Sequence, residues 1–220
     1  MGRLIVIEGI DGSGKSTQVR LLYGRLEKEA RDFMRVTFPQ YSEPSSALVK
    51  MYLAGEFGTD PEAVNAYAAS SFFAVDRFAS YKKQWQRYFE GGGTVLTDRY
   101  TTSNAIHQGA KLEEAERERF FTWLYEYEFE LLRLPRPTAV IYLDVPVEVS
   151  VARMRLREKE TGAKADIHET DTEYLEKCAQ CGRQAATHYG WQTVSCMTGG
   201  REKTEEELHE EIYKIFSERQ

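Results

Sequence analysis

Short apolar runs rich in β-branched residues alternate along this chain with longer stretches of helical periodicity. Apolar runs bounded by turn residues are typical of strands, and amphipathic stretches between them are typical of helices. The expected strands are Arg3–Glu8, Arg35–Phe38, Thr94–Thr97, Thr138–Leu143 and Gln192–Cys196. Because strands and helices alternate, the pattern predicts an α/β fold with a five-stranded parallel sheet flanked by helices.

Six helices are expected between and after these strands, and several have recognisable ends. Three consecutive glycines, Gly91-Gly92-Gly93, end the second helix, as glycine commonly does at a helix C-terminus. Thr204 and Glu207 have the spacing of a capping box at the start of the last helix. The expected helices are Ser16–Arg31, Pro61–Glu90, Leu112–Leu132, Val147–Arg157, Thr172–Tyr189 and Thr204–Ser217.

One polar stretch, from Glu158 to Asp171, interrupts the alternation between two expected helices. It has neither helical nor strand periodicity. It is either an exposed loop or a mobile lid over a site, and long structureless loops in compact domains tend to be functional. We therefore expect a lid segment at about residues 153–171.

Composition and charge restrict the classes of protein that this chain can represent. Its 220 residues, 41% hydrophobic and 29% charged, predict one globular domain over residues 1–220 and exclude intrinsic disorder. The net charge of −6 and the pI near 5.4 argue against a nucleic-acid coat or a polybasic membrane binder. We therefore expect no nucleic-acid or membrane partner, and any bound phosphate must be held by a local cluster of cations.

The cysteines and the apolar runs predict a cytoplasmic protein. Cys178, Cys181 and Cys196 are too few and too clustered for a secreted disulfide framework. The first apolar run stops at Glu8, short of a signal peptide, and the later run Ala139–Leu143 is far too short to span a membrane. For Cys178 and Cys181 a zinc site would need two more ligands at suitable spacing, so helix packing is favoured over metal binding.

The segment Gly9–Ser16 fits the phosphate-loop pattern G-x-x-x-x-G-K-[ST] at every required position. An apolar strand precedes it and a helix follows, so backbone amides at the helix N-terminus can surround a phosphate. We expect Lys15 to meet the β and γ oxygens of ATP and the Ser16 hydroxyl to bind Mg²⁺. The residues expected to contact the nucleotide are Gly9, Ile10, Asp11, Gly12, Ser13, Gly14, Lys15, Ser16 and Thr17.

A phosphate loop does not say which molecule accepts the phosphoryl group, and the end of the third strand is more informative. There Asp98-Arg99-Tyr100 places an acid and a cation at the ligand-binding edge of the sheet. Asp98 can organise Mg²⁺ through water, and Arg99 can clamp a phosphate. The alternative for this pair is a plain surface ion pair.

Four motifs together resemble one family of enzymes over nearly the whole chain. They are Glu8–Thr17, Phe38-Pro39, Phe73-Ala74-Val75-Asp76-Arg77, and Asp98-Arg99-Tyr100 with Ser103 and Gln108-Gly109. In these motifs the chain resembles the thymidylate kinase family, nucleoside monophosphate kinases with the three-layer fold of P-loop NTPases. The resemblance implies transfer of the γ-phosphoryl group of ATP to dTMP, giving dTDP for dTTP synthesis, in a homodimer.

The resemblance also implies roles for residues of the acceptor site. Asp11 would hydrogen-bond the sugar 3′-hydroxyl, Phe73 would stack on thymine, and Arg77 would bond a base carbonyl. Arg99 would bind the acceptor phosphate, and Gln108 would help to read the base. The helical spacing of Phe73 and Arg77 lets both converge on one planar ligand. The remaining expected members of this site are Phe38, Pro39, Tyr41 and Ser103.

The cation for the transferring phosphoryl group is expected from the lid. Gly12 stands where the eukaryotic members carry an arginine, whereas Arg153, Arg155 and Arg157 lie at the junction of helix and lid, which resembles the bacterial arrangement. An arginine that reaches the transferring group contributes strongly to phosphoryl transfer. Arg153 is the first candidate and Arg157 the second; the alternative is a basic helix end that interacts with its own dipole.

Three departures from the family pattern surround the acceptor. Gln40-Tyr41 follows Phe38-Pro39 where the family usually has an arginine, and His107 replaces the tyrosine before Gln108. The lid has Asp166-Ile167-His168-Glu169 where bacterial members often have Asp-Arg before an acid. The preferred monophosphate therefore stays open.

Two other readings of the phosphate loop stay open. A deoxynucleoside kinase, or a related deoxynucleoside monophosphate kinase, shares the loop and lid, and Glu8 could then serve as the base for a sugar 5′-hydroxyl. A nucleotide-dependent regulatory switch is disfavoured, because Asp144-Val145-Pro146 lacks the glycine that senses a γ-phosphate. The aromatic stretch Phe120–Phe129 predicts a helix that packs on the sheet, and its excess of aromatic side chains for one helix face also suggests a surface for a second copy of the chain.

Overall fold

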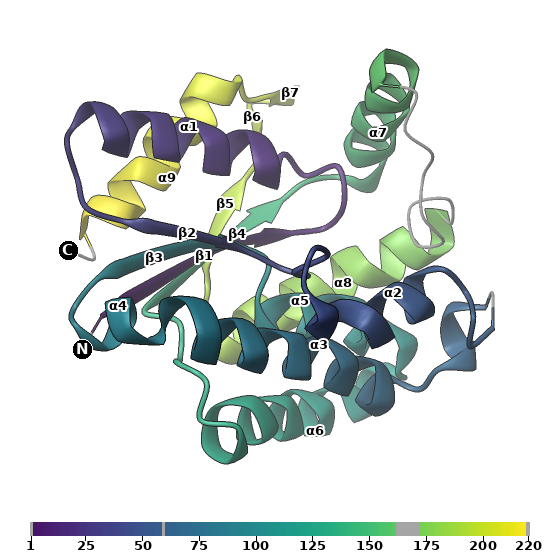
Figure 1. The fold of residues 1–220 in the computed structure, drawn as a ribbon. Coiled ribbons are helices and arrows are strands. Elements are labelled where there is room, and N and C mark those ends of the chain that lie inside the picture. The colour runs from purple at the N-terminus through teal and green to yellow at the C-terminus, as the bar shows by residue number, and fades with distance from the viewer. Residues whose placement is uncertain (1, 59, 162–171, 219–220) are drawn as a thin grey trace.

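A computed structural model describes residues 2–58, 60–161 and 172–218 of the chain. Its centre is a sheet of five parallel strands in the order β2-β3-β1-β4-β5 (Figure 1). The α/β class and the five-stranded parallel sheet predicted from the sequence are confirmed. The strands are β1 (Arg3–Gly9), β2 (Met34–Thr37), β3 (Thr94–Asp98), β4 (Ala139–Asp144) and β5 (Gln192–Ser195).

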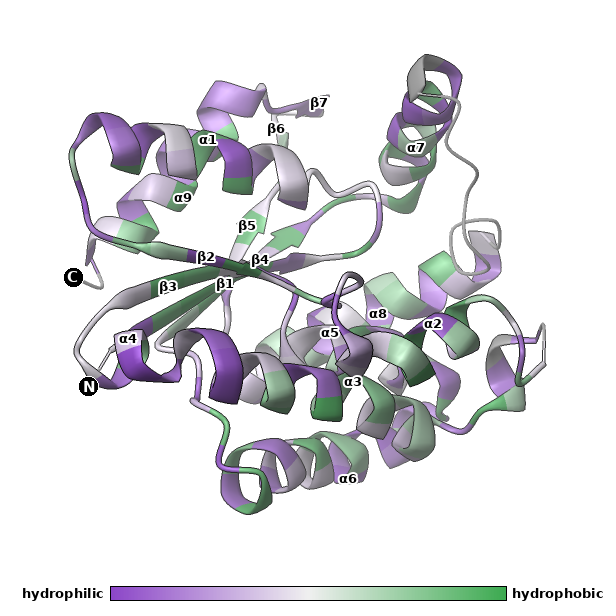
Figure 2. Ribbon diagram, viewed as in Figure 1, coloured by the Kyte–Doolittle hydropathy of each residue, from purple (hydrophilic) through white to green (hydrophobic). Residues whose placement is uncertain are grey.

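The central strands are apolar on both faces because helices cover both sides of the sheet. Leu4, Ile5, Val6 and Ile7 of β1 are each at most 2% exposed, and no polar side chain interrupts this run. Continuous hydrophobic runs of this kind are the signature of parallel strands buried from both sides. In Figure 2 the same strands form a hydrophobic centre between amphipathic helices.

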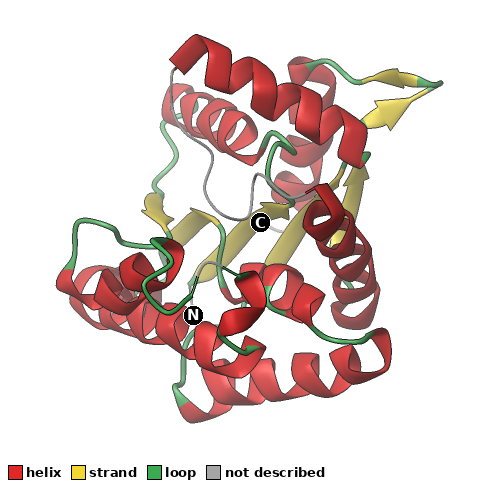
Figure 3. Ribbon diagram, turned by 90° about the vertical axis from the view of Figure 1, so that its right-hand side faces the viewer, coloured by secondary structure: helices red, strands yellow, loops and turns green. Residues whose placement is uncertain are grey.

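Helices cover both faces of the sheet in two layers, and further segments lie beyond its carboxyl edge (Figures 1 and 3). One layer holds α1 (Lys15–Lys28) and α9 (Glu205–Glu218). The other holds α3 (Ala66–Ser80), α4 (Gln86–Glu90), α5 (Thr101–His107), α6 (Glu114–Tyr125) and α8 (Thr172–Tyr189). Beyond the carboxyl edge lie α2 (Ala47–Leu53) and α7 (Val147–Thr161), and the short hairpin of β6 (Met197–Thr198) and β7 (Arg201–Glu202) projects outward.

The expected single helix over Pro61–Glu90 is wrong in its beginning and in its regularity. Pro61–Ala63 forms a separate 3₁₀ turn, and α3 begins only at Ala66, where the Asn65 side chain accepts a hydrogen bond from the Ala68 amide. A π-helical segment, Tyr81–Trp85, then separates α3 from α4. The expected helix over Leu112–Leu132 likewise ends in a π-helical segment, Glu126–Leu131, after α6.

The start of the expected loop after Val147–Arg157 is also wrong. Helix α7 continues to Thr161, so Glu158–Thr161 is helical. The rest of the expected lid, residues 162–171 with Asp166-Ile167-His168-Glu169, lies outside the described residues. Two short helices, α2 and α5, were not predicted. In α5 nearly every side chain is buried, so its sequence shows no amphipathic period.

Both predicted helix-end signals are confirmed. Helix α4 ends at Glu90 with Gly91 as its C-cap. At the start of α9 the Glu207 amide donates to Thr204 Oγ1 at 3.2 Å, and the Thr204 amide donates to Glu207 Oε2 at 2.8 Å. These reciprocal bonds satisfy two backbone donors that the helix itself leaves unpaired. Among the described residues no helix has the length and apolarity needed to cross a membrane.

Candidate active site

The phosphate loop joins β1 to α1 and wraps around its own lysine. Lys15 is the first residue of α1, and its Nζ donates to the backbone oxygens of Gly9 at 2.6 Å and Ile10 at 2.8 Å. The side chain is only 7% exposed, and this burial lowers the pKa of Lys15 to about 8. Lys15 therefore lies inside the loop, where its ammonium group can exchange these carbonyl partners for phosphate oxygens.

Helix α7 packs directly on the phosphate loop at Gly12. The Ser150 hydroxyl donates to the Asp11 carbonyl, and a Cβ added at Gly12 would lie 2.5 Å from the Ser150 carbonyl oxygen. Gly12 also has a φ of 74°, which favours glycine. A side chain as large as arginine at this position would therefore collide with α7.

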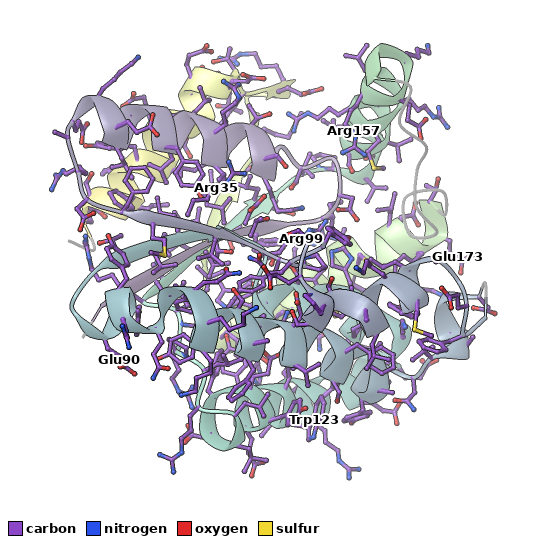
Figure 4. All side chains as sticks on the ribbon, viewed as in Figure 1. Arg35, Glu90, Arg99, Trp123, Arg157 and Glu173 are labelled. Atoms are coloured by element: carbon purple, nitrogen blue, oxygen red, sulfur yellow. The ribbon has the colours of Figure 1, made fainter. Side chains whose placement is uncertain are left out.

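Arg153 of α7 places its guanidinium group beside the loop. Its Nη1 donates to the Ser13 carbonyl at 3.1 Å, and its Nη2 donates to Glu202 Oε2 of β7 at 2.9 Å. Arg157 lies one turn further along α7, in an exposed position (Figure 4). Of the two candidate arginines, the structure thus places Arg153 against the phosphate loop and Arg157 farther out on the same helix.

Asp11 and Arg99 form an ion pair between the phosphate loop and the end of β3. The guanidinium of Arg99 donates to Asp11 Oδ1, and its Nη1 lies 3.1 Å from His107 Nε2. Burial works to raise the pKa of Asp11, but the positive charges of Arg99 and Lys15 outweigh it and hold that pKa well below its usual range. Asp11 is therefore a carboxylate at all physiological pH values.

A cavity opens beside this ion pair, and Asp11 of the phosphate loop is part of its lining. It gathers side chains from β1–α1, from the segment after β2, from α3 and from α5, which brings four distant motifs together. All nine residues expected at the acceptor site line it. The full lining is Asp11, Phe38, Pro39, Tyr41, Leu53, Phe73, Arg77, Arg99, Tyr100, Ser103, Asn104, His107 and Gln108.

Aromatic rings form the walls of this cavity. The Phe73 ring meets the Tyr52 ring edge-on at 6.2 Å between centroids, so its orientation is held from behind. Phe38 is buried against Tyr100, whereas Tyr41 is 55% exposed at the mouth. The cavity therefore has an aromatic lining, and aromatic faces attract planar ligands.

Arg77 lines the cavity but is held by an acid that the sequence did not suggest. Its Nε and Nη2 donate to the two carboxylate oxygens of Glu128 at 2.7 and 2.5 Å, and both side chains are at most 2% exposed. Asn104 was also missed, although it directly follows Ser103 in the same motif. Leu53 was missed because it belongs to the unpredicted helix α2.

The comparison with protein families decides between the folds that carry a phosphate loop. The family model "Thymidylate kinase" matches residues 7–212. The chain belongs to the thymidylate kinase family. The matched stretch includes the phosphate loop, the cavity and α7, so the resemblance seen in the motifs is confirmed.

Named members of this family align with a shorter part of the chain. The thymidylate kinase of Mycobacterium tuberculosis (strain H37Rv) is 35% identical over 122 residues, covering 55% of this chain and 56% of that protein. The probable thymidylate kinase of Thermococcus gammatolerans is 34% identical over 113 residues, covering 50% and 54%. The thymidylate kinase of Halothermothrix orenii is 34% identical over 109 residues, covering 49% of this chain and 50% of that protein. The chain thus spans about half the length of the curated relatives it matches.

Glu8, the residue before the thymidylate kinase phosphate loop, is fully enclosed. It is 0% exposed; Oε1 accepts the Gly9 amide at 3.0 Å, and Oε2 accepts the hydroxyls of Thr102 and Ser103, both at 2.7 Å. Glu8 does not line the cavity. Its geometry is that of a group that ties α5 to the loop, and a base for a sugar hydroxyl would need an open oxygen.

The oxygen donors beside Lys15 fit a magnesium ion. Asp98 Oδ1 is buried and has no hydrogen-bond partner among the described residues, and Ser16 is exposed at the first turn of α1. Carboxylate and hydroxyl oxygens suit Mg²⁺, which commonly takes one or two protein ligands and completes its shell with water and substrate phosphates. Ser16 and Asp98 are thus the residues that would hold it.

The two cysteines of the C-x-x-C spacing pack behind the cavity. Cys178 lies 3.6 Å from His107 Nδ1, and Cys181 donates to the Ala105 carbonyl at 3.3 Å. Burial raises the pKa of both thiols. In the part of the chain that the structure describes, no three or more histidine, cysteine or acidic side chains are grouped as metal ligands.

Proposed function

We propose that the chain transfers the γ-phosphoryl group of ATP to dTMP, forming dTDP and ADP with the help of Mg²⁺. The observation that carries the proposal is the position of the Asp11–Arg99 pair: Asp11 belongs to the phosphate loop, and both residues line the cavity. A nucleotide held by the loop and a monophosphate held in the cavity would therefore meet at this pair. Membership of the thymidylate kinase family supports the same reaction.

The cavity offers each part of dTMP a matching group. Phe73 would stack on the thymine ring, and Arg77 would donate to a ring carbonyl. Asp11 would accept a hydrogen bond from the 3′-hydroxyl, and Arg99 would hold the phosphate. Gln108 supports a polar ligand here, because its Oε1 is buried without a hydrogen-bond partner among the described residues, and a buried acceptor of this kind is costly unless a ligand satisfies it.

Positioned cations carry the reaction. An oxygen of the acceptor phosphate forms a bond to the γ-phosphorus, while the bond to the β–γ bridging oxygen breaks and its electron pair leaves with ADP. Lys15 and Arg153, with Arg157 as second candidate, neutralise the oxygens of the transferring group. No general base is required, because the acceptor phosphate is already an anion. Bound Mg²⁺, held by Ser16 and Asp98, would supply further neutralisation of the β and γ phosphates.

The enclosure of Glu8 disfavours the alternative reaction on a deoxynucleoside. A sugar 5′-hydroxyl must give up its proton, which requires a base within hydrogen-bond reach of the substrate. Glu8, the residue considered for this role, already accepts three hydrogen bonds and lies behind the cavity wall. A monophosphate acceptor needs no such base.

A homodimer in the cytoplasm completes the proposal, with no nucleic-acid or membrane partner. Within the stretch Phe120–Phe129, the side chains of Phe120, Phe121 and Phe129 are buried inside the chain, so these rings pack on its own core. An apolar face is exposed instead on α3, where Tyr67, Val75 and Phe78 lie on one side of the helix and are 36%, 42% and 37% exposed. A second copy of the chain would cover this face.

A panel of acceptors tests the reaction. The purified chain is given ATP and Mg²⁺ with dTMP, with other deoxynucleoside monophosphates, or with deoxythymidine, and the products are separated by chromatography. We expect dTDP from dTMP, no dTMP from deoxythymidine, and at least about a 100-fold loss of rate in Lys15→Ala, which removes a cation from the transferring group. Phosphorylation of deoxythymidine, or a rate equal to that of Lys15→Ala, would overturn the proposal.

A further inference from the structure

Glu128 joins three elements behind the cavity and belongs to none of the expected motifs. It lies in the π-helical segment after α6 and is 0% exposed. Its carboxylate accepts hydrogen bonds from Arg77 of α3 and from Thr101 and Asn104 of α5. Short π-helical segments are frequent at functional sites, where they redirect side chains.

These hydrogen bonds fix the direction in which Asn104 presents its amide. Asn104 Nδ2 donates to the Ser70 carbonyl at 3.1 Å and to Glu128 Oε1 at 3.3 Å. Both partners are acceptors, so a flipped amide would set oxygen against oxygen at both contacts. The amide hydrogens therefore stay behind the wall, and Oδ1 is the atom with which Asn104 can meet a ligand in the cavity.

Glu128 fixes Arg77 in the complementary way. It occupies Nε and Nη2 of the guanidinium, so that Nη1 is the donor group left unused by hydrogen bonds among the described residues. Arg77 and Asn104 both line the cavity. The wall thus offers a donor from Arg77 beside an acceptor from Asn104.

A donor beside an acceptor matches one kind of pyrimidine edge. Thymine and uracil present a carbonyl next to a ring N–H, whereas cytosine presents an amino group next to a bare ring nitrogen. A site built to pair one pattern rejects the other strongly, because its own buried polar groups would be left unpaired.

We infer that Glu128 is a positioning residue that holds Arg77 and Asn104 in one hydrogen-bonding direction and thereby sets a preference for pyrimidines with a carbonyl beside a ring N–H. The inference rests on the proposed function, since it concerns the base of the proposed acceptor. Glu128 itself touches no substrate, and it acts by fixing which atoms of its neighbours face the cavity.

Replacing Glu128 by glutamine tests this role. One carboxylate oxygen becomes an NH₂ group, which cannot accept from Arg77 or Asn104, so the Asn104 amide can turn and offer a donor to the cavity. We expect the ratio of kcat/KM for dTMP to that for dCMP to fall at least ~10-fold in Glu128→Gln, with the KM for ATP within about 2-fold of the wild type. The dTMP to dUMP ratio should stay constant, because these two bases share the same edge.

Thr101→Val is the matched control. It removes the 2.7 Å hydrogen bond to Glu128 Oε2 but changes no residue of the cavity lining. It should lower the melting temperature and leave the dTMP to dCMP ratio within about 2-fold of the wild type. An equal change of ratio in Thr101→Val would show that any disturbance of this region alters selectivity, and would overturn the inference.

Two further measurements do not depend on the folding of Glu128→Gln. Glu128→Asp keeps the charge but withdraws the carboxylate by one methylene. In this variant, too, the ratio of kcat/KM for dTMP to that for dCMP should fall. In wild-type protein labelled with ¹⁵N, the side-chain amide protons of Asn104 should exchange slowly with solvent both before and after dTMP binds. An Asn104 amide that turns to the ligand, or an unchanged ratio in folded Glu128 variants that still phosphorylate dTMP, would overturn the inference. A wild type without activity on dTMP would instead overturn the proposed function.

Discussion

Two adjacent phenylalanines of α3 have different surroundings, which allows the stacking role to be tested at a single residue. Phe73 lines the cavity, whereas Phe72 packs on Phe57 with ring centroids 5.7 Å apart. Stacking of a base on an aromatic ring contributes ~1–3 kcal/mol. Phe73→Ala should therefore raise the KM for dTMP roughly 10-fold and change the KM for ATP by less than about 2-fold, measured with both substrates varied.

Phe72→Ala provides the control for that measurement, because it removes the same ring from the same helix outside the cavity. It should leave both KM values close to those of the wild type. If Phe73→Ala raised the KM for ATP as much as that for dTMP, the ring would act on the whole site and the stacking role would be wrong.

Site residues that belong to short sequence motifs could be predicted, whereas a residue whose partners are far away in the sequence could not. The phosphate loop needs only eight consecutive residues, and Phe73 and Arg77 lie four apart on one helix, so both patterns are visible in the sequence. Glu128 gave no such signal, because its partners Asn104, Thr101 and Arg77 are 24, 27 and 51 positions away. It also stands in an aromatic stretch that is typical of core packing.

The capping box of α9 gives a prediction at the scale of an element. Glu207 accepts hydrogen bonds from Arg201 and from the Thr204 amide, which together lower its pKa to about 2 from its ordinary value near 4.5. A carboxylate with a lowered pKa stabilises the folded state fully above its unfolded pKa, and this contribution is lost as the pH falls. The wild type should therefore lose this contribution between about pH 4.5 and pH 2.

Glu207→Gln isolates this effect. The difference in melting temperature between wild type and Glu207→Gln should be largest near pH 7 and should shrink as the pH is lowered below about 4.5, followed by circular dichroism in low salt. Because the group is exposed, high salt should also reduce the difference. A difference that stays constant from pH 7 to pH 3 would contradict a role for the charge of Glu207.

Elements with local signals were predicted well, and elements set by packing were not. Helix α8 has the predicted bounds Thr172–Tyr189, and α9 begins one residue after the predicted N-cap Thr204. The π-helical segments Tyr81–Trp85 and Glu126–Leu131 depend on which side chains the core accepts, and periodicity cannot show this. Helix α5 was not predicted for a related reason, since burial on all sides removes the polar face that identifies a helix in a sequence.

For the whole molecule, the parallel sheet explains how an acidic chain can hold phosphates. Lys15, Arg77, Arg99 and Arg153 are far apart in sequence, yet they all gather around the carboxyl edge of the sheet, where β1 and β3 end. Parallel strands place their carboxyl ends at one edge, and ligands bind there in open α/β sheets. The net charge of −6 therefore describes the remaining surface, and the predicted topology already implied this convergence.

The exposed face of α3 supports a prediction about the assembled protein. Val75 is 42% exposed and lies beside Phe78 on that face, so Val75→Glu would place a charge in an apolar interface without disturbing the core. In sedimentation velocity the wild type should have twice the 25.4 kDa of one chain, and Val75→Glu should sediment as a monomer with an unchanged fold. Leu156→Glu on α7, at a side chain 58% exposed, is the control and should remain dimeric. A monomeric wild type, or equal dissociation by Leu156→Glu, would show that α3 is not the face that pairs.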